Sequence, residues 1–213
     1  MIERYQNSMI NLALCQFQTA GDKQLNLQKA KAFIQMAKDK EANIIALPEM
    51  FNCPYEGISF RKFAELEGEE TFKLLEEMSK DIVLIGGYIP EKDKEGFCYN
   101  TSYIFENGKL IGKHRKIHLF NIDFNNIKMH ESDYLKPGQE TTVVNTSFGP
   151  IGIAICFDIR FPEIFLEMNK KEPFLYVIPS TFNKVTGPAH FKLLGRSRAV
   201  DFQSFCSFNL HSF

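Results

Sequence analysis

Residues 151–163 read IGIAICFDIRFPE, and this stretch indicates the class of fold. Residues 151–155 form an almost continuous apolar run, which predicts a buried strand. Pro162 suits the first turn of a helix, because the N–H group that proline lacks would have no partner there. The stretch therefore predicts a strand followed by a helix, with Cys156 at the junction between them.

The alternation of strands and helices continues on both sides of this stretch. Asn26 can cap a helix whose apolar residues recur at helical spacing as far as Ala37. The other predicted helices cover residues 70–80, 162–170 and 190–202, and the other predicted buried strands cover residues 10–15, 44–47, 82–88 and 175–178. Strands that alternate with helices are typical of an α/β domain.

Two hairpins interrupt this alternation. The paired segments are residues 99–105 with 109–113 and residues 141–146 with 151–155. Their turns contain Asn107-Gly108, which tolerates positive φ, and Gly149-Pro150. The sequence has no repeat, low-complexity segment or linker, so it predicts one α/β domain with mixed sheets.

Composition and charge exclude several classes of protein. The 213 residues are 44% hydrophobic, which is enough for one sizeable core. The 25 Lys and Arg residues nearly balance the 26 Asp and Glu residues, whereas a nucleic-acid-binding protein needs an excess of cations. Every apolar stretch is shorter than the roughly 18 residues of a membrane helix, and residues 1–8 carry no signal pattern. We therefore expect a cytoplasmic protein whose partners include neither nucleic acid nor membrane.

The five cysteines and five histidines do not form a metal-binding pattern. The number of cysteines is odd and no two make a CxxC pair, so we expect neither a disulfide framework nor a structural zinc site. His114 and His118 are four residues apart, but they lie in a predicted strand, where this spacing does not build the two-histidine face of a helix. We therefore expect no metal.

Glu49 is the first candidate functional residue. It follows the buried strand at residues 44–47, and open α/β sheets place their chemistry at the carboxyl ends of strands. The alternative is an ordinary solvated glutamate in a loop.

Lys116 is the second candidate and lies in the segment HRKIHLF, residues 114–120. In a strand it shares one face with His114 and His118, while Ile117 and Leu119 point to the other face. The apolar neighbours favour partial burial of the lysine stem. The alternative is a solvated basic cluster.

Cys156 is the third candidate, and the alternative is a small buried apolar side chain. The helix that begins near Pro162 directs its positive end toward the junction, which predicts a lowered thiol pKa. Backbone N–H groups after Cys156 can also stabilise an oxyanion.

Taken together, LPEMF around Glu49, HRKIHLF around Lys116 and CFDIRFPE around Cys156 resemble the three signature segments of the carbon–nitrogen hydrolase (nitrilase) superfamily, in the correct order. The segments FNCPY, YNTSYIF and TGPAHFKLLGRSRAVDFQ are similar to the omega-amidases, which hydrolyse the distal amide of short 2-oxo dicarboxylic acid monoamides. The resemblance covers residues 10–208, nearly the whole chain.

The resemblance implies a four-layer α-β-β-α sandwich and hydrolysis through a cysteine thioester, without metal or organic cofactor. Cys156 is implied as the nucleophile and Glu49 as the general base and acid. Lys116 and the backbone N–H of Phe157 are implied as the oxyanion donors. Glu131 matches a second glutamate that orients Lys116 or the substrate.

The resemblance also implies how the substrate is bound. Arg160 matches a position suited to the substrate carboxylate, which a guanidinium binds with two parallel hydrogen bonds. Phe157, Phe182 and Thr186 are implied as further substrate-binding residues. The partners are then a small-molecule amide and water.

The family pattern also bears on the organisation of the chain. Residues 1–9 are expected to be an N-terminal extension, and residues 10–213 a carbon–nitrogen hydrolase domain that lacks the usual C-terminal strands and tail. A homodimer or higher homo-oligomer is expected if this chain assembles. Two alternatives stay open: an amidase for an N-carbamoyl amine or deaminated glutathione, and an inactive truncated protein that acts as an interaction partner.

Overall fold

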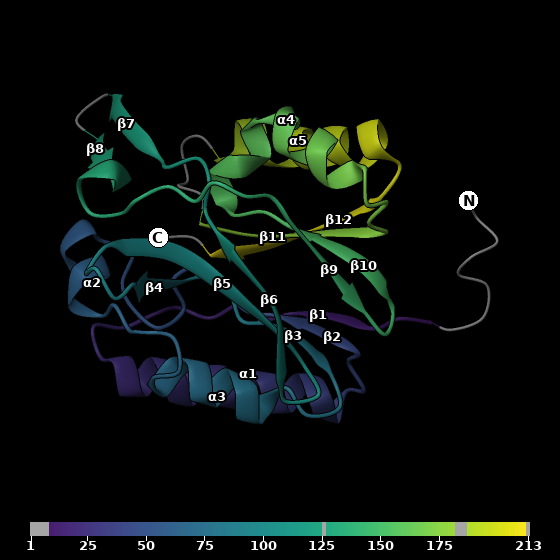
Figure 1. Ribbon diagram of the computed structural model, residues 1–213, viewed down its shortest axis with the longest axis horizontal. Helices are drawn as coiled ribbons and strands as arrows, with labels where there is room; N and C mark the ends of the chain where they lie inside the picture. The colour runs from purple at the N-terminus through teal and green to yellow at the C-terminus, as the bar shows by residue number, and fades with distance from the viewer. Residues whose placement is uncertain (1–8, 125–126, 182–186, 212–213) are drawn as a thin grey trace.

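Two β-sheets lie face to face at the centre of the computed structural model, and each is covered by helices on its outer side (Figure 1). The structure describes residues 9–124, 127–181 and 187–211. The elements in chain order are β1 (Leu12–Leu14), α1 (Lys23–Asp39), β2 (Ile44–Ala46), α2 (Gly57–Lys62), α3 (Glu70–Met78), β3 (Val83–Ile85), β4 (Ile89–Lys92), β5 (Cys98–Glu106), β6 (Lys109–Arg115), β7 (Asn121–Phe124), β8 (Ile127–His130), η2 (Glu131–Asp133), β9 (Thr142–Thr146), β10 (Gly149–Ile153), η3 (Cys156–Arg160), α4 (Pro162–Asn169), β11 (Leu175–Thr181), α5 (Gly187–Phe202) and β12 (Phe205–His211).

The first sheet contains the strands from β1 to β6. Strands β1, β2 and β3 run parallel, and β5 pairs antiparallel with β3. Both β4 and β6 pair antiparallel with β5. Helices α1 and α3 cover the outer face of this sheet (Figure 1).

The second sheet has the strand order β12-β11-β10-β9. The hairpin of β9 and β10 is antiparallel, whereas β10, β11 and β12 run parallel. Helices α4 and α5 lie on its outer face (Figure 1), which completes four layers in the order α-β-β-α. The expected sandwich with mixed sheets is confirmed.

Alternation along β2 assigns its residues to two different cores. Ile44 and Ala46 belong to the core between the sheets, where they join Ile153 and Val177 of the second sheet. Residue Ile45, between them, points to the opposite face and packs against the helical layer. Because both faces of β2 are apolar and covered, its sequence is a continuous apolar run.

Two local expectations are wrong. Asp22, and not Asn26, caps α1, because its carboxylate accepts from the backbone nitrogens of Gln24 and Leu25. Asn26 is buried inside the helix and bonds the backbone of Ala20. The strand expected at residues 10–15 covers only Leu12–Leu14 and is not fully buried. In the described residues, β1 pairs with β2 on one side only.

Within the described ranges, no helix combines the length and apolar character that crossing a bilayer requires.

Candidate active site

The three candidate residues come from both sheets and meet between them. Glu49 follows β2 and Lys116 follows β6, both in the first sheet, whereas Cys156 follows β10 in the second. Their exposed fractions are 1%, 0% and 6%, so none of them is a solvated surface residue. Packing of the two sheets thus brings together side chains that are 67 and 40 positions apart in the chain.

The carboxylate of Glu49 is held from several sides. One oxygen, Oε1, accepts from the side-chain amide of Asn100 at 3.0 Å and lies 3.3 Å from Lys116 Nζ. The other, Oε2, accepts from the backbone nitrogen of Thr181 at 2.8 Å. Burial raises the pKa of Glu49; the charge of Lys116 opposes this, and the charge of Glu131 adds to it. Glu49 therefore binds a proton more readily than a solvated glutamate does.

Lys116 lies between two carboxylates. Its Nζ is 2.8 Å from Glu131 Oε1 and 3.3 Å from Glu49 Oε1. Glu131 also accepts from Tyr55 Oη at 2.5 Å and from the backbone nitrogen of Phe120 at 2.6 Å. Burial opposes the charged ammonium, but Glu131 and Glu49 outweigh it and hold the pKa of Lys116 above its usual range. The lysine is therefore a fixed cation.

Cys156 occupies a sharp turn at the end of the strand. Its φ is +44°, a left-handed conformation that is rare for a residue with a side chain. The thiol donates to the carbonyl oxygen of Thr181, with Sγ 3.5 Å from it. Burial, and then the negative charge of Glu49, raise the pKa of the thiol well above its usual value. The predicted lowering of the thiol pKa by the helix that begins at Pro162 is wrong, because burial and the charge of Glu49 raise it and η3 separates Cys156 from the start of α4.

Asp158 joins the Cys156 turn to the segment that carries Lys116. Its Oδ2 accepts from the backbone nitrogen of Ile155 at 3.0 Å. Its Oδ1 is 2.8 Å from both the backbone nitrogen and ring Nδ1 of His118. Burial opposes ionisation, but the contacts of His114 and His118 lower the pKa of Asp158 below its usual range. The ionised carboxylate of Asp158 thus accepts from Ile155, next to Cys156, and from His118, near Lys116.

The predicted substrate-binding residues are only partly placed. Arg160 is half-buried at the end of η3, with Nη2 3.1 Å from His190 Nδ1. The Phe157 ring lies 5.5 Å from the Arg160 guanidinium carbon and packs edge-on against Phe120. The predictions for Phe182 and Thr186 fall outside the described residues.

Comparison with known proteins assigns the chain to a family. The profile of the carbon–nitrogen hydrolase family matches residues 11–209. The chain belongs to this family. It is 45% identical over 206 residues to omega-amidase NIT3 of Saccharomyces cerevisiae, covering 91% of this chain and 71% of the relative. It is 48% identical to nitrilase homolog 2 of Dictyostelium discoideum, covering 86% of this chain and 58% of that protein. The crystal structure of Saccharomyces cerevisiae Nit3, described as a member of branch 10 of the nitrilase superfamily, superposes with a TM-score of 0.86 at 42% identity, covering 94% of this chain and 75% of that one.

Three residues that contact the catalytic cluster of this carbon–nitrogen hydrolase are not among the candidates predicted from the sequence. Tyr55 bonds Glu131, Asn100 bonds Glu49, and Thr181 contacts both Glu49 and Cys156 through its backbone. Tyr55 and Asn100 lie in FNCPY and YNTSYIF, two segments that carry the resemblance. These two motifs could therefore have indicated Tyr55 and Asn100 as site residues. Thr181 could not be recognised in this way, because it acts through main-chain atoms that every residue has.

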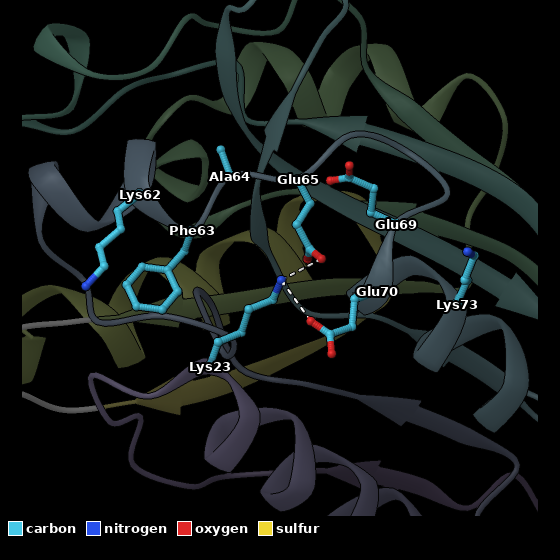
Figure 2. Close-up of a pocket in the computed structure, with 8 residues that line it drawn as sticks. All are labelled: Lys23, Lys62, Phe63, Ala64, Glu65, Glu69, Glu70 and Lys73. Atoms are coloured by element: carbon cyan, nitrogen blue, oxygen red, sulfur yellow. Dashed lines mark ion pairs between the residues drawn. The ribbon is translucent and has the colours of Figure 1, made fainter.

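A second region, separate from the buried cluster, is a cavity lined mainly by charged side chains. Its volume is about 810 Å³, and its lining residues are drawn in Figure 2. Lys23 Nζ lies 2.6 Å from Glu65 Oε1 and 3.2 Å from Glu70 Oε2. Lys62, Glu69 and Lys73 add further charges at its edge (Figure 2). Lys23 pairs with both Glu65 and Glu70, and the residues that line the cavity include no cysteine. The hydrolase chemistry therefore belongs to the buried cluster and not to this cavity.

In the described part of the chain, no group of three or more His, Cys, Asp and Glu side chains is arranged to hold a metal ion.

Proposed function

We propose that this protein is an omega-amidase, which hydrolyses the distal amide of a short 2-oxo dicarboxylic acid monoamide such as 2-oxoglutaramate. The observation that carries the proposal is the buried contact of one lysine with two carboxylates, one of which also contacts the thiol of Cys156. The omega-amidase names of relatives such as NIT3 of Saccharomyces cerevisiae and NIT2 of Mus musculus support the same activity.

The first half of the reaction forms a thioester. The Cys156 thiol gives its proton to Glu49 as sulfur bonds to the amide carbon. Negative charge then develops on the substrate oxygen, where Lys116 and the backbone N–H of Phe157 stabilise it. Glu49 passes the proton to the amide nitrogen, the carbon–nitrogen bond breaks, and ammonia leaves.

The second half of the reaction uses the same groups. Glu49 takes a proton from water as the water oxygen attacks the thioester carbon. The carbon–sulfur bond breaks, the proton returns to sulfur, and the carboxylic acid product leaves. A base that serves both halves must gain and lose a proton readily, which agrees with the raised pKa of Glu49.

The two glutamates have different parts in this proposal. Glu131 accepts from three donors, including Lys116 at 2.8 Å, so its negative charge is well compensated. Glu49 lies 3.3 Å from the lysine and shares the cation with Glu131. Because Lys116 lies closer to Glu131, and Glu49 is the carboxyl that contacts the Cys156 thiol, Glu49 is the proton carrier and Glu131 orients Lys116.

Arg160 is proposed to bind the carboxylate of the substrate. The test compares ammonia release from the acid amide and from its methyl ester, for wild type and for Arg160→Lys. Wild type should prefer the acid, and Arg160→Lys should lose most of that preference because a point charge cannot reproduce the forked contact. Equal use of acid and ester by wild type would contradict the omega-amidase assignment. No ammonia release from any amide would favour the inactive interaction protein instead.

The remaining parts of the proposal concern organisation and location. We propose that residues 10–213 form the catalytic domain after an extension at residues 1–9, that the protein assembles as a homo-oligomer, and that it acts in the cytoplasm. Light scattering on the purified protein measures the assembly, and fractionation of the source cells measures the location.

A further inference from the structure

In the described part of the chain, two groups lie against the guanidinium of Arg160, and neither carries a negative charge. The nitrogen Nη2 lies 3.1 Å from Nδ1 of His190, and the ring of Phe157 lies beside the guanidinium carbon at 5.5 Å. A guanidinium only donates, so Nδ1 of His190 must offer its lone pair and the ring proton must sit on Nε2. His190 is therefore a neutral acceptor in this contact.

The helix that carries His190 is itself anchored to η3. Arg198, buried in α5, donates from Nε to the carbonyl oxygen of Ile159 at 3.0 Å. His190 and Arg198 are eight positions apart, about two helical turns, so both contact the end of η3 from one side of α5. This contact holds α5 against η3, and His190 lies on the part of α5 next to Arg160.

A neutral partner suits an arginine that has to bind an anion. A carboxylate at the position of His190 would compete with the substrate for the guanidinium. A histidine nitrogen restricts the orientation of the side chain and leaves its positive charge available.

We propose that His190 is a specificity-determining positioning residue, whose Nδ1 orients Arg160 so that its free N–H groups meet the carboxylate of the substrate. This inference rests on the proposed function, because it requires a substrate with a carboxylate.

Two substitutions of His190 distinguish the role of Nδ1 from that of Nε2. Asparagine places its Oδ1 where histidine has Nδ1, whereas glutamine places its polar end near Nε2. His190→Asn should therefore keep the contact with Arg160, and His190→Gln should lose it. Lys192→Gln, at an exposed position of the same helix, controls for changes on α5 that leave this contact intact.

The experiment measures kcat/KM for ammonia release from 2-oxoglutaramate and from its methyl ester. In His190→Gln the preference for the acid should fall about three- to tenfold, through a higher KM for the acid, which is the net effect of a single hydrogen bond. His190→Asn and Lys192→Gln should stay within about twofold of wild type, a difference below that range, and the ester should be used equally by all four proteins.

The possible outcomes distinguish this inference from the proposed function. A wild type without acid preference would overturn the substrate class and this inference with it. A wild type with acid preference would overturn this inference alone if His190→Gln kept that preference, or if acid and ester were impaired equally. An equal loss of preference in His190→Asn and His190→Gln would overturn the assignment to Nδ1.

Discussion

The carboxylate of Asp158 accepts from the backbone and from the ring of His118, with both nitrogens at 2.8 Å. His118 is two residues after Lys116, and Asp158 is two residues after Cys156. The contact therefore restrains the cation and the nucleophile relative to each other, although they belong to different sheets. The Asp158 carboxylate has no exposed surface, so water cannot replace a lost partner.

Asp158→Asn should reduce the free energy of unfolding by about 2–4 kcal/mol at pH 7, because a buried charged acceptor is lost. The folded state lowers the pKa of Asp158 below its unfolded value of about 3.9, so its contribution is full above that pH. The contribution is lost as the pH falls toward the folded pKa. Urea unfolding at pH 7 and at pH 3.5 should therefore show a smaller difference between variant and wild type at the lower pH. Asp81→Asn, at an exposed aspartate, is the control, and a difference independent of pH would contradict the role of the charge.

Glu49→Gln should lower kcat by about 10²–10⁴-fold and change KM little, because the amide cannot transfer a proton. Cys156→Ala, folded but without a nucleophile, supplies the background rate. Steady-state kinetics measure the effect, and mass spectrometry after mixing with substrate should detect the thioester in wild type and not in Cys156→Ala. A loss confined to KM would assign Glu49 to binding.

Glu131→Gln should shift the acid limb of the kcat/KM profile to lower pH. Burial is the largest cause of the raised Glu49 pKa, but the negative charge of Glu131 adds to it, so its removal lets Glu49 ionise at lower pH. The rate at the optimum should also fall by about tenfold or more, since Lys116 loses its shorter ion pair. Glu140→Gln, at an exposed carboxylate, should change neither quantity. An acid limb that stays in place or moves upward would contradict the coupling of the two glutamates.

Gly87→Ala should damage the site through the backbone. A Cβ at Gly87 would lie 2.4 Å from the carbonyl oxygen of Pro48, the residue before Glu49, and φ is +51°. We expect a loss of about 2–4 kcal/mol in unfolding free energy from strain and crowding together, with a lower kcat. Gly96→Ala is the matched control, because its φ is +87° but a Cβ meets nothing within 4 Å. It should lose some stability and keep its kcat, so an equal effect of both changes on kcat would contradict the crowding of Pro48.

The sequence indicates Glu49 and Cys156 because each follows an apolar run that predicts a strand. The expectation that Lys116 lies inside a strand with His114 and His118 is wrong, because β6 ends at Arg115 and Lys116 follows it. Other features depend on contacts that no local pattern carries. Tyr55 reaches Glu131 across 76 positions, and the thiol pKa of Cys156 depends on burial beside Glu49. A helix start can be read from a sequence, but the opposing effect of a carboxylate from another sheet cannot.

The same limit explains the error at the start of α1. Asp22 and Asn26 are both residues that can cap a helix, and they are four positions apart. Asn26 is drawn into the interior by two bonds to the backbone of Ala20, which leaves the terminus to Asp22. Propensity identifies both candidates, and tertiary structure decides between them.

The division of the site between two sheets makes the activity depend on the contact between them. A chain in which each sheet has formed but the sandwich has not closed carries an ordinary thiol, with its proton acceptor elsewhere. Reactivity toward amides is then a property of the assembled interior and of no single segment. Any opening that moves the sheets apart separates the thiol from Glu49 and Lys116, and should stop hydrolysis without a change in any of the three residues.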